Sequence, residues 1–309
     1  MSQLKPMPAT NDEWTIHALN IHGVFFERWC AKTINETPNF RVVSTNYSVE
    51  FPLPVNGVRG KESALDIRAE ITTHDFLLTL IVECKKNNPD FVDWIFFPTQ
   101  LYRPRILEAP IIINEPKQKT QIGWEVKNDR TARYFSDIPF TDESRETKGN
   151  YQSIPNNSTK TKTSNAAITE AAYQVSLATQ AIFFEELENS KKAADIAGLE
   201  SRPRYSEQVI LPVIVTSAKL FVCNFDAGNV DPNTGEIPFE KAELKEHPYL
   251  IFDYPLPRHL QYIPHNSLTK RSRYKIESFM QMQIMVVNSA HLQDFLKMIE
   301  SDAREFRYL

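Results

Sequence analysis

The segment FLLTLIVEC, residues 76–84, limits the fold most strongly, because it is almost continuously apolar. A strand of this composition is covered on both faces, as in a sheet that has helices on both sides. Two β-rich alternating segments precede it, at 40–51 and 64–71, and helical patterns lie at 12–34 and 166–197. We therefore predict an α/β fold in which a central mixed β-sheet is flanked by helices.

The chain is expected to form one domain, residues 1–309, with an insertion at about 87–164 after the third strand. In that segment prolines recur and polar stretches such as DESRETKGN dominate, although DWIFFP and APIIIN are apolar enough to be structured. Beyond the helix at 166–197 we expect two strands joined by a tight turn near Ser217 and Ala218. Further strands and a closing helix over SAHLQDFLKMIESDAREF follow.

Composition excludes several classes of protein. No run of eighteen apolar residues is present, and the first residues have no apolar leader pattern, so we expect a cytoplasmic protein without a membrane span. The three cysteines are far apart and indicate neither a disulfide framework nor a zinc cluster. The glycine-rich motifs of P-loop and dinucleotide-binding proteins are missing, as is GxSxG.

A net charge of −4 argues against attachment to nucleic acid by charge alone, but local basic clusters remain candidates for such contacts. Two of these clusters are KTKTS, with Lys160 and Lys162, and TKRSRYK, with Arg271, Arg273 and Lys275. The alternative is that each is an ordinary solvated loop.

Three charged residues at strand ends are candidates for a catalytic metal site. Glu83 and Lys85 are two positions apart in a strand, so their side chains project to the same face while that of Cys84 projects to the other. Asp66 lies on the polar face of the preceding strand, and a hairpin would place it beside Glu83. Two carboxylates in this arrangement, with the backbone carbonyl of Cys84, offer the oxygen ligands that Mg²⁺ prefers.

The order helix, strand, strand, strand, with Asp66 on the second strand and Glu83-Cys84-Lys85 on the third, resembles the PD-(D/E)XK nuclease superfamily, which has a restriction-endonuclease-like core. Leu65 stands where the motif name has proline. The resemblance implies a nuclease that depends on Mg²⁺ or Mn²⁺. It implies that Asp66 and Glu83 bind the metal and that Lys85 positions the attacking water.

The superfamily often adds a glutamate from the first helix and a glutamine or lysine from the helix after the third strand. Glu27 matches the first of these, on a helical stripe that contains Ile16, Gly23, Cys30 and Ile34. Gln174 is the candidate for the second, as an auxiliary residue. Tyr173 immediately precedes Gln174, so the glutamine–tyrosine spacing of the RecB-like branch is missing.

The function that this resemblance implies is a DNA endonuclease of restriction or phage-defence type. A homodimer would suit it, because two sites cut both strands of a duplex. Simpler interpretations also exist: Asp66 as part of a solvated strand face, Glu83 and Lys85 as a surface ion pair, and Glu27 and Gln174 as ordinary helix residues. The alternative function is a catalytically inert protein on the same fold that binds nucleic acid or acts as a scaffold.

Overall fold

The structure is a computed structural model. It describes residues 11–51, 61–72, 76–87, 92–99, 106–116, 124–134, 137–147, 166–196, 205–261 and 280–302. Within these ranges, none of the helices is both long and apolar enough to cross a membrane.

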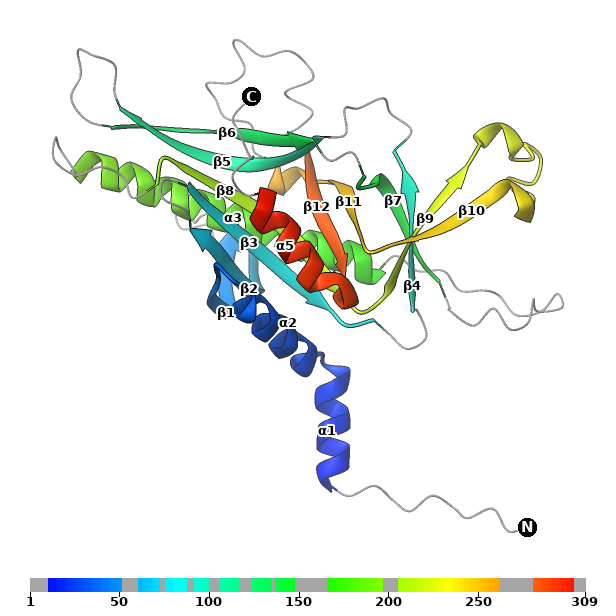
Figure 1. Cartoon of the computed structure of the whole chain (residues 1–309). Helices are drawn as coiled ribbons and strands as arrows, with labels where there is room; N and C mark the ends of the chain where they lie inside the picture. The colour runs from blue at the N-terminus through cyan, green and yellow to red at the C-terminus, as the bar shows by residue number, and fades with distance from the viewer. Residues whose placement is uncertain are drawn as a thin grey trace.

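The described chain begins with two helices, α1 (Asn11–Ile21) and α2 (Val24–Glu36), where a single helix was expected. The single-helix prediction is wrong because Gly23, directly before α2, has φ +78°, a left-handed conformation that ends the regular helix. Ile16 therefore lies on α1 and does not share a stripe with Cys30. Figure 1 shows α1 projecting from the body of the molecule.

Twelve strands of the described chain form one mixed sheet in the order β1-β2-β3-β8-β12-β11-β7-β4-β9-β10, with β5 paired to β8 and β6 paired to β5. Their bounds are β1 Phe40–Phe51, β2 Lys61–Thr72, β3 Phe76–Lys85, β4 Asp93–Pro98, β5 Ile106–Pro116, β6 Trp124–Tyr134, β7 Phe140–Thr147, β8 Glu207–Thr216, β9 Lys219–Phe225, β10 Ala242–His247, β11 Tyr249–Pro255 and β12 Gln281–Asn288. The remaining elements are α3 (Ala166–Ile196), α5 (Leu292–Asp302) and short 3₁₀ turns, among them η3 (Arg258–Leu260).

The segments that the sequence marks most strongly form one continuous part of this sheet. Strands β1, β2 and β3 are antiparallel neighbours. The chain returns later through α3 to β8, which runs parallel to β3 with Glu83 opposite Ile214 and Lys85 opposite Thr216. A helix is the usual connection before a strand that adds in parallel.

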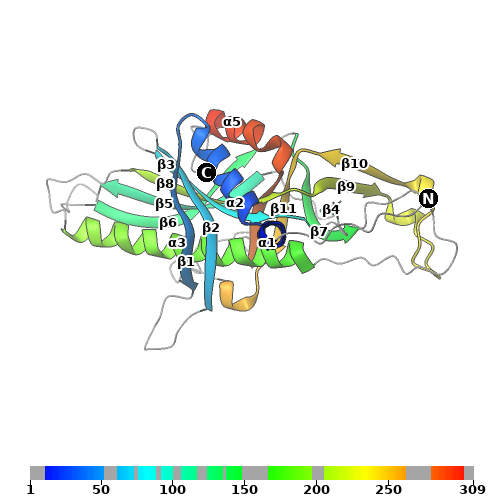
Figure 2. The same cartoon turned by 90° about the horizontal axis from the view of Figure 1, so that it is seen from below.

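Helices cover both faces of this part of the sheet, as predicted (Figure 2). One core lies between the sheet and α3, and Ile81 of β3 belongs to it. The other core lies beneath α2 and α5 and receives the opposite side of β3, through Leu78, Leu80, Val82 and Cys84. Strand β3 is apolar throughout because it separates the two cores.

The described part of residues 87–164, the segment expected as an insertion with some structure, contributes strands β4, β5, β6 and β7 to the same sheet. Strand β4 pairs with β9, β5 with β8, and β7 with both β4 and β11. The expected tight turn between β8 and β9 and the closing helix α5 are both present. After this turn β9 joins β4 instead of β8, so the two strands lie in different parts of the sheet.

Candidate active site

Asp66 and Glu83 meet at the end of the β2–β3 hairpin. The register pairs Ile67 with Val82, which puts Asp66 and Glu83 opposite each other at the next position. Asp66 Oδ2 accepts a hydrogen bond from the backbone N–H of Cys84, with a donor–acceptor distance of 2.7 Å. The backbone of β3 therefore holds the first carboxylate next to the second.

Glu83 is 6% exposed and lies on the side of β3 that faces α3. Burial, followed by the negative charge of Asp66, raises the pKa of Glu83 from 4.5 to about 9, and the charge of Lys85 opposes this rise. Two acids placed this close in a poorly solvated site disfavour the doubly charged form. Glu83 therefore holds a proton at neutral pH in the absence of a cation.

The pKa of Asp66 is raised as well. Burial raises the pKa of Asp66 from 3.8 to about 6, against the effect of its hydrogen bond from Cys84, and the charge of Glu27 adds to the rise. Perturbed acids of this kind are concentrated at functional sites. When both carboxylates are ionised, the pair carries two negative charges beside the single positive charge of Lys85, and a bound cation would favour that doubly charged form.

Lys85 lies beside the two carboxylates, and its charge lowers the pKa of both Asp66 and Glu83. Its direct partner is Glu170 on α3, with 3.1 Å between Lys85 Nζ and Glu170 Oε2. Sequence reasoning missed Glu170, a single glutamate among the alanines at the start of α3. The one available signal was that Glu170 precedes Gln174 by four residues, so both occupy one face of α3.

Glu27 is on α2 and reaches the same region electrostatically. Its charge raises the pKa of Asp66 and of Glu83, while partial burial raises its own pKa. Its Oε1 lies 3.8 Å from the position that a Cβ on Gly23 would occupy. Glu27 therefore lies in the first turn of α2, beside the break at Gly23, and acts on Asp66 and Glu83 through its charge rather than by a direct contact.

Cys84 points away from the two carboxylates, as the alternation of β3 requires. Its side chain packs against that of Cys30 of α2 and forms a hydrogen bond with it. This hydrogen bond, followed by burial, raises the pKa of the Cys84 thiol well above its ordinary value. Both cysteines are buried, and the raised pKa keeps the Cys84 thiol protonated and therefore unreactive. Cys84 contacts the carboxylate pair through its backbone N–H, which donates to Asp66.

Gln174 lies on α3 one turn after Glu170. Its Oε1 is buried, and no residue in the described part of the chain donates a hydrogen bond to it. A buried carbonyl oxygen without a partner is costly, and the cost is removed when a donor arrives. The candidate basic residues Lys160, Lys162, Arg271, Arg273 and Lys275 lie outside the described residues.

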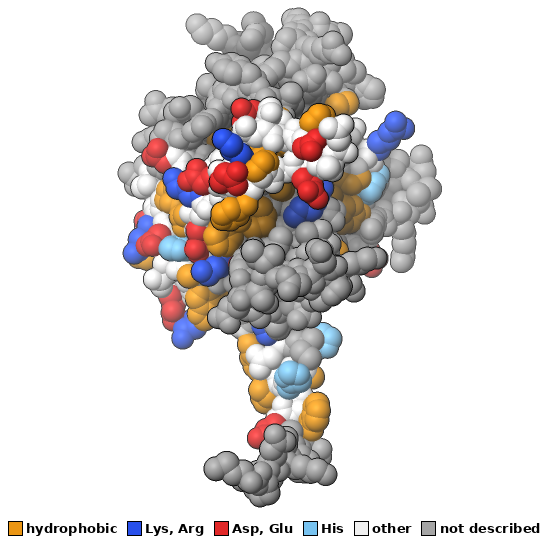
Figure 3. Space-filling model, turned by 90° about the vertical axis from the view of Figure 1, so that its right-hand side faces the viewer, with side chains coloured by type: hydrophobic (Ala, Val, Ile, Leu, Met, Phe, Trp, Pro, Cys, Tyr) orange, Lys and Arg blue, Asp and Glu red, His pale blue; other side chains and the backbone are white. Residues whose placement is uncertain are grey.

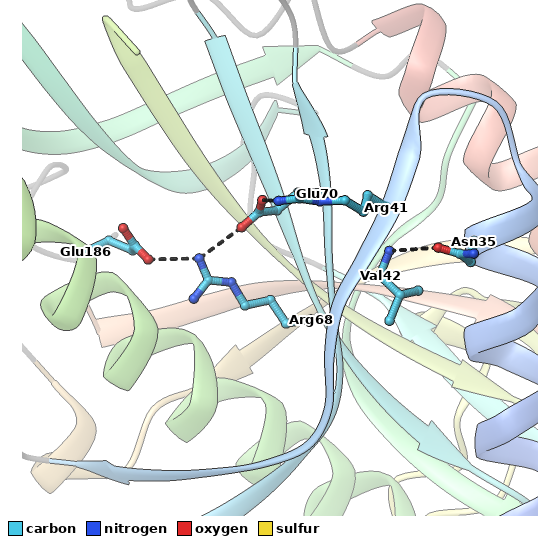
Figure 4. Close-up of polar contacts among 6 residues, drawn as sticks. All are labelled: Asn35, Arg41, Val42, Arg68, Glu70 and Glu186. Carbon is cyan, nitrogen blue, oxygen red and sulfur yellow. Dashed lines mark hydrogen bonds and ion pairs between the residues drawn. The ribbon is translucent and has the colours of Figure 1, made fainter. Parts of the chain in front are cut away.

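A charged network holds the strand that carries Asp66. Arg68 Nη2 contacts Glu70 Oε1 at 3.0 Å and Glu186 Oε1 of α3 at 2.8 Å, and Arg41 of β1 reaches the other oxygen of Glu70 (Figure 4). On the side of α2, Asn35 accepts a hydrogen bond from the backbone N–H of Val42 in β1. Strands β1 and β2 are thus attached to helices on both faces of the sheet, β1 to α2 and β2 to α3.

The residues present fit a hard divalent cation. Within the described ranges, no three His, Cys, Asp or Glu side chains are close enough to bind a metal by themselves. Mg²⁺ does not require such a group, because it uses one or two carboxylates and keeps several waters. Asp66, Glu83 and the Cys84 carbonyl supply oxygen ligands of the right kind, and burial, the main cause of the raised pKa of both acids, leaves their ionised forms poorly solvated without a cation.

Comparison of the chain with protein-family models, with curated proteins and with solved structures gives no match.

Proposed function

We propose that this chain is a metal-dependent nuclease that hydrolyses phosphodiester bonds in DNA, built on a restriction-endonuclease-like core. The observation that carries the proposal is the meeting of Asp66, Glu83 and Lys85 at one end of the β2–β3 hairpin. These are three residues from different strand positions, in the chemical types that the PD-(D/E)XK resemblance requires.

The connection of the strands supports the same proposal. An antiparallel meander β1–β2–β3 is followed, after strands β4 to β7, by α3 and by β8, which runs parallel to β3, and α2 lies on the opposite face. This is the order of elements expected for the superfamily. Fold alone does not define function, so the site residues carry the argument and the topology adds to it.

In the proposed site, Asp66, Glu83 and the backbone carbonyl of Cys84 would hold Mg²⁺ or Mn²⁺. A bound divalent cation supplies Lewis-acid polarisation of a phosphoryl oxygen and makes water a better nucleophile at neutral pH. Glu83 gives up its proton when it becomes a ligand. Glu27, at the edge of the site, would orient solvent through its carboxylate.

Lys85 would have two roles. Its ammonium group donates hydrogen bonds that fix the direction of the attacking water. Its positive charge offsets the negative charge that builds up on the phosphoryl oxygens as the new bond forms. Both roles require the ammonium to lie close to the paired carboxylates, which is where it exerts its effect on their pKa values.

The test is a cleavage assay on supercoiled plasmid, linear duplex, single-stranded DNA and RNA, each with Mg²⁺, Mn²⁺ or EDTA. We expect cation-dependent cutting of DNA that Lys85→Ala abolishes without unfolding the chain. Lys86→Ala is the matched control, because Lys86 is the next residue and is exposed, with its Nζ on the carbonyl of Asn20. Cutting by the Lys85→Ala variant would refute the assignment.

A protein that binds DNA with or without EDTA, and cuts none of these substrates, would instead be the inert nucleic-acid-binding module on the same fold. A role in restriction or phage defence is an extension by analogy with the superfamily. It would require that a cell expressing the active chain, and not the Lys85→Ala variant, resist infection.

A further inference from the structure

Strands β9 and β10 form a two-stranded arm that extends from the body of the molecule (Figure 1). Their antiparallel register pairs Leu244 with Cys223 and Ala242 with Phe225. Among the strands of the described chain, β10 pairs with β9 alone, and it is the last strand at this end of the sheet. A free edge of this kind is a template on which another strand can add through its backbone hydrogen bonds.

One face of the arm is apolar and only partly covered. Leu220 and Val222 of β9 point into the core between the sheet and α3. The alternate side chains of β9 point the other way together with Leu244, and on that side Phe225 is 37% exposed and Leu244 is 49% exposed. Phe97 of β4 lies edge-on to Phe225, with 6.2 Å between the ring centroids. Figure 3 faces the end of the molecule that carries the arm and shows apolar side chains among acidic and basic ones there.

The charges along β10 indicate what its edge can pair with. Glu243 and Lys245 flank Leu244, and both are exposed. In the part of the chain that the structure describes, neither of them forms an ion pair. Glu246, by contrast, already contacts Lys219, with 3.6 Å between Lys219 Nζ and Glu246 Oε2. Two charges of opposite sign on one face of β10 are therefore available to a partner strand.

A second β10, antiparallel to the first about a two-fold axis, fits these charges in one register. The axis keeps like faces of the two strands together, so it passes through a residue and not between two residues. With the axis at Leu244, Glu243 of each copy lies opposite Lys245 of the other. With the axis at Glu243 or at Lys245, two like charges lie opposite each other. Opposite charges directly across a strand pair stabilise it and like charges destabilise it, so the charges select the register centred on Leu244.

We propose that the occupant of this edge is a second copy of the chain, with β10 of each copy pairing with β10 of the other about an axis at Leu244. The outer pair in this register, Ala242 opposite Glu246, adds no contact between like charges. The apolar face continues across the axis, because the two Leu244 side chains meet on the side that carries Phe225. Such a contact is self-complementary, as a two-fold interface requires. It is independent of the proposed nuclease activity.

Reversal of the two charges tests the partner and the register together. Sedimentation velocity at a concentration on the order of tens of micromolar should show a dimer for the wild type. Glu243→Lys alone places lysine opposite lysine twice, and Lys245→Glu alone places glutamate opposite glutamate twice. Each should raise the dissociation constant by about tenfold or more, because two favourable pairs become unfavourable. The double variant Glu243→Lys/Lys245→Glu exchanges the charges and should dimerise again.

An equimolar mixture of the two single variants should form a heterodimer, since one copy then carries lysine and the other glutamate at both positions. Lys192→Glu, a charge reversal on the exposed part of α3, is the control and should leave the dimer unchanged. Glu243 and Lys245 are exposed, so we expect every variant to fold, and circular dichroism checks this.

Three results would overturn the proposal. The first is a wild type that is monomeric at this concentration. The second is a dimer that both single variants retain, because the contact would then lie elsewhere on the molecule. The third is a loss of the dimer in the single variants that neither the double variant nor the mixture restores.

Discussion

Lys85 and Glu170 form an ion pair, 3.1 Å between Nζ and Oε2, which connects the last residue of β3 to the second turn of α3. Helix α3 therefore holds the Lys85 ammonium group, which we propose acts at Asp66 and Glu83. Glu170 is 59% exposed at its side chain, so the pair is partly screened by solvent.

The substitution Glu170→Gln should reduce cleavage by less than about tenfold. A pair exposed to this degree contributes up to about 1 kcal/mol, and about 1.4 kcal/mol corresponds to a factor of ten in rate. Single-turnover cleavage, compared with the complete loss expected for Lys85→Ala, measures the effect. Equal losses in the two variants would show that Glu170 does more than hold Lys85.

The pH dependence of stability without divalent cations should distinguish the wild type from Glu83→Gln. Because the folded state raises the pKa of Glu83 from 4.5 to about 9, it binds that proton more tightly than the unfolded chain does. The stabilisation is therefore complete below about pH 4.5 and is lost as the pH rises through about 9. Thermal unfolding in EDTA should show Glu83→Gln gaining on the wild type as the pH rises, and a constant difference would contradict this.

Divalent cations should make the wild type more stable relative to Glu83→Gln. Mg²⁺ or Mn²⁺ should raise the melting temperature of the wild type, and more so at higher pH, because proton and cation compete for the oxygens of Glu83. Glu83→Gln should lose this response. Glu143→Gln is the control, since Glu143 is an exposed carboxylate of β7 that pairs with Arg145, and its removal should leave the cation effect intact. Differential scanning fluorimetry is sufficient for the comparison.

Asp66→Asn should separate folding from chemistry at the same site. The amide oxygen of asparagine can still accept the hydrogen bond from Cys84 N–H, so we expect a folded chain. The charge is lost, and with it cation-dependent stabilisation and cleavage. An active Asp66→Asn variant would remove Asp66 from the proposed set of ligands.

Glu186→Ala should destabilise the fold by about 1–3 kcal/mol, because it leaves Arg68 with one carboxylate in a site where the arginine side chain is only 14% exposed. Glu188→Ala, two residues further along α3, is the matched control. Its pair with Lys191 is exposed at both ends, and its loss should cost under about 1 kcal/mol. Urea unfolding measures both, and similar costs would mean that the network in Figure 4 contributes little to stability.

The parts of the fold that the sequence predicts are those in which local pattern and burial agree. Strand β2 alternates because Ile67, Ala69 and Ile71 lie in one core while Arg68 between them forms a charged network with α3. Strand β3 is apolar on both sides because two cores meet there, and α3 has the length and composition of a long helix. The meeting of Asp66 and Glu83 was predictable for the same reason, since a short hairpin sets the register.

The remainder depends on contacts that no local pattern encodes. Strands β4 and β7 pair with β9 and β11, which lie far along the chain, so the sequence alone does not show which strands residues 87–164 join. The break at Gly23 depends on one backbone angle, and the sequence pattern of α1 and α2 is helical on both sides of it. The partnership of Glu170 with Lys85 required the path of α3 over the sheet.

The position of β8 has a consequence for how the chain acquires its structure. Strand β8 pairs with β3 along its length, with β5 over its first half and with β12 over its second, so three segments distant in sequence meet on one strand. Folding is slow because the entropy of closing these long loops is lost before the strand pairs can form and stabilise the chain. During synthesis the β1–β3 hairpins emerge long before β8 can cover their edge, and an uncovered apolar edge invites aggregation. Yield of folded chain should therefore depend on chaperones and low temperature more than its final stability would suggest.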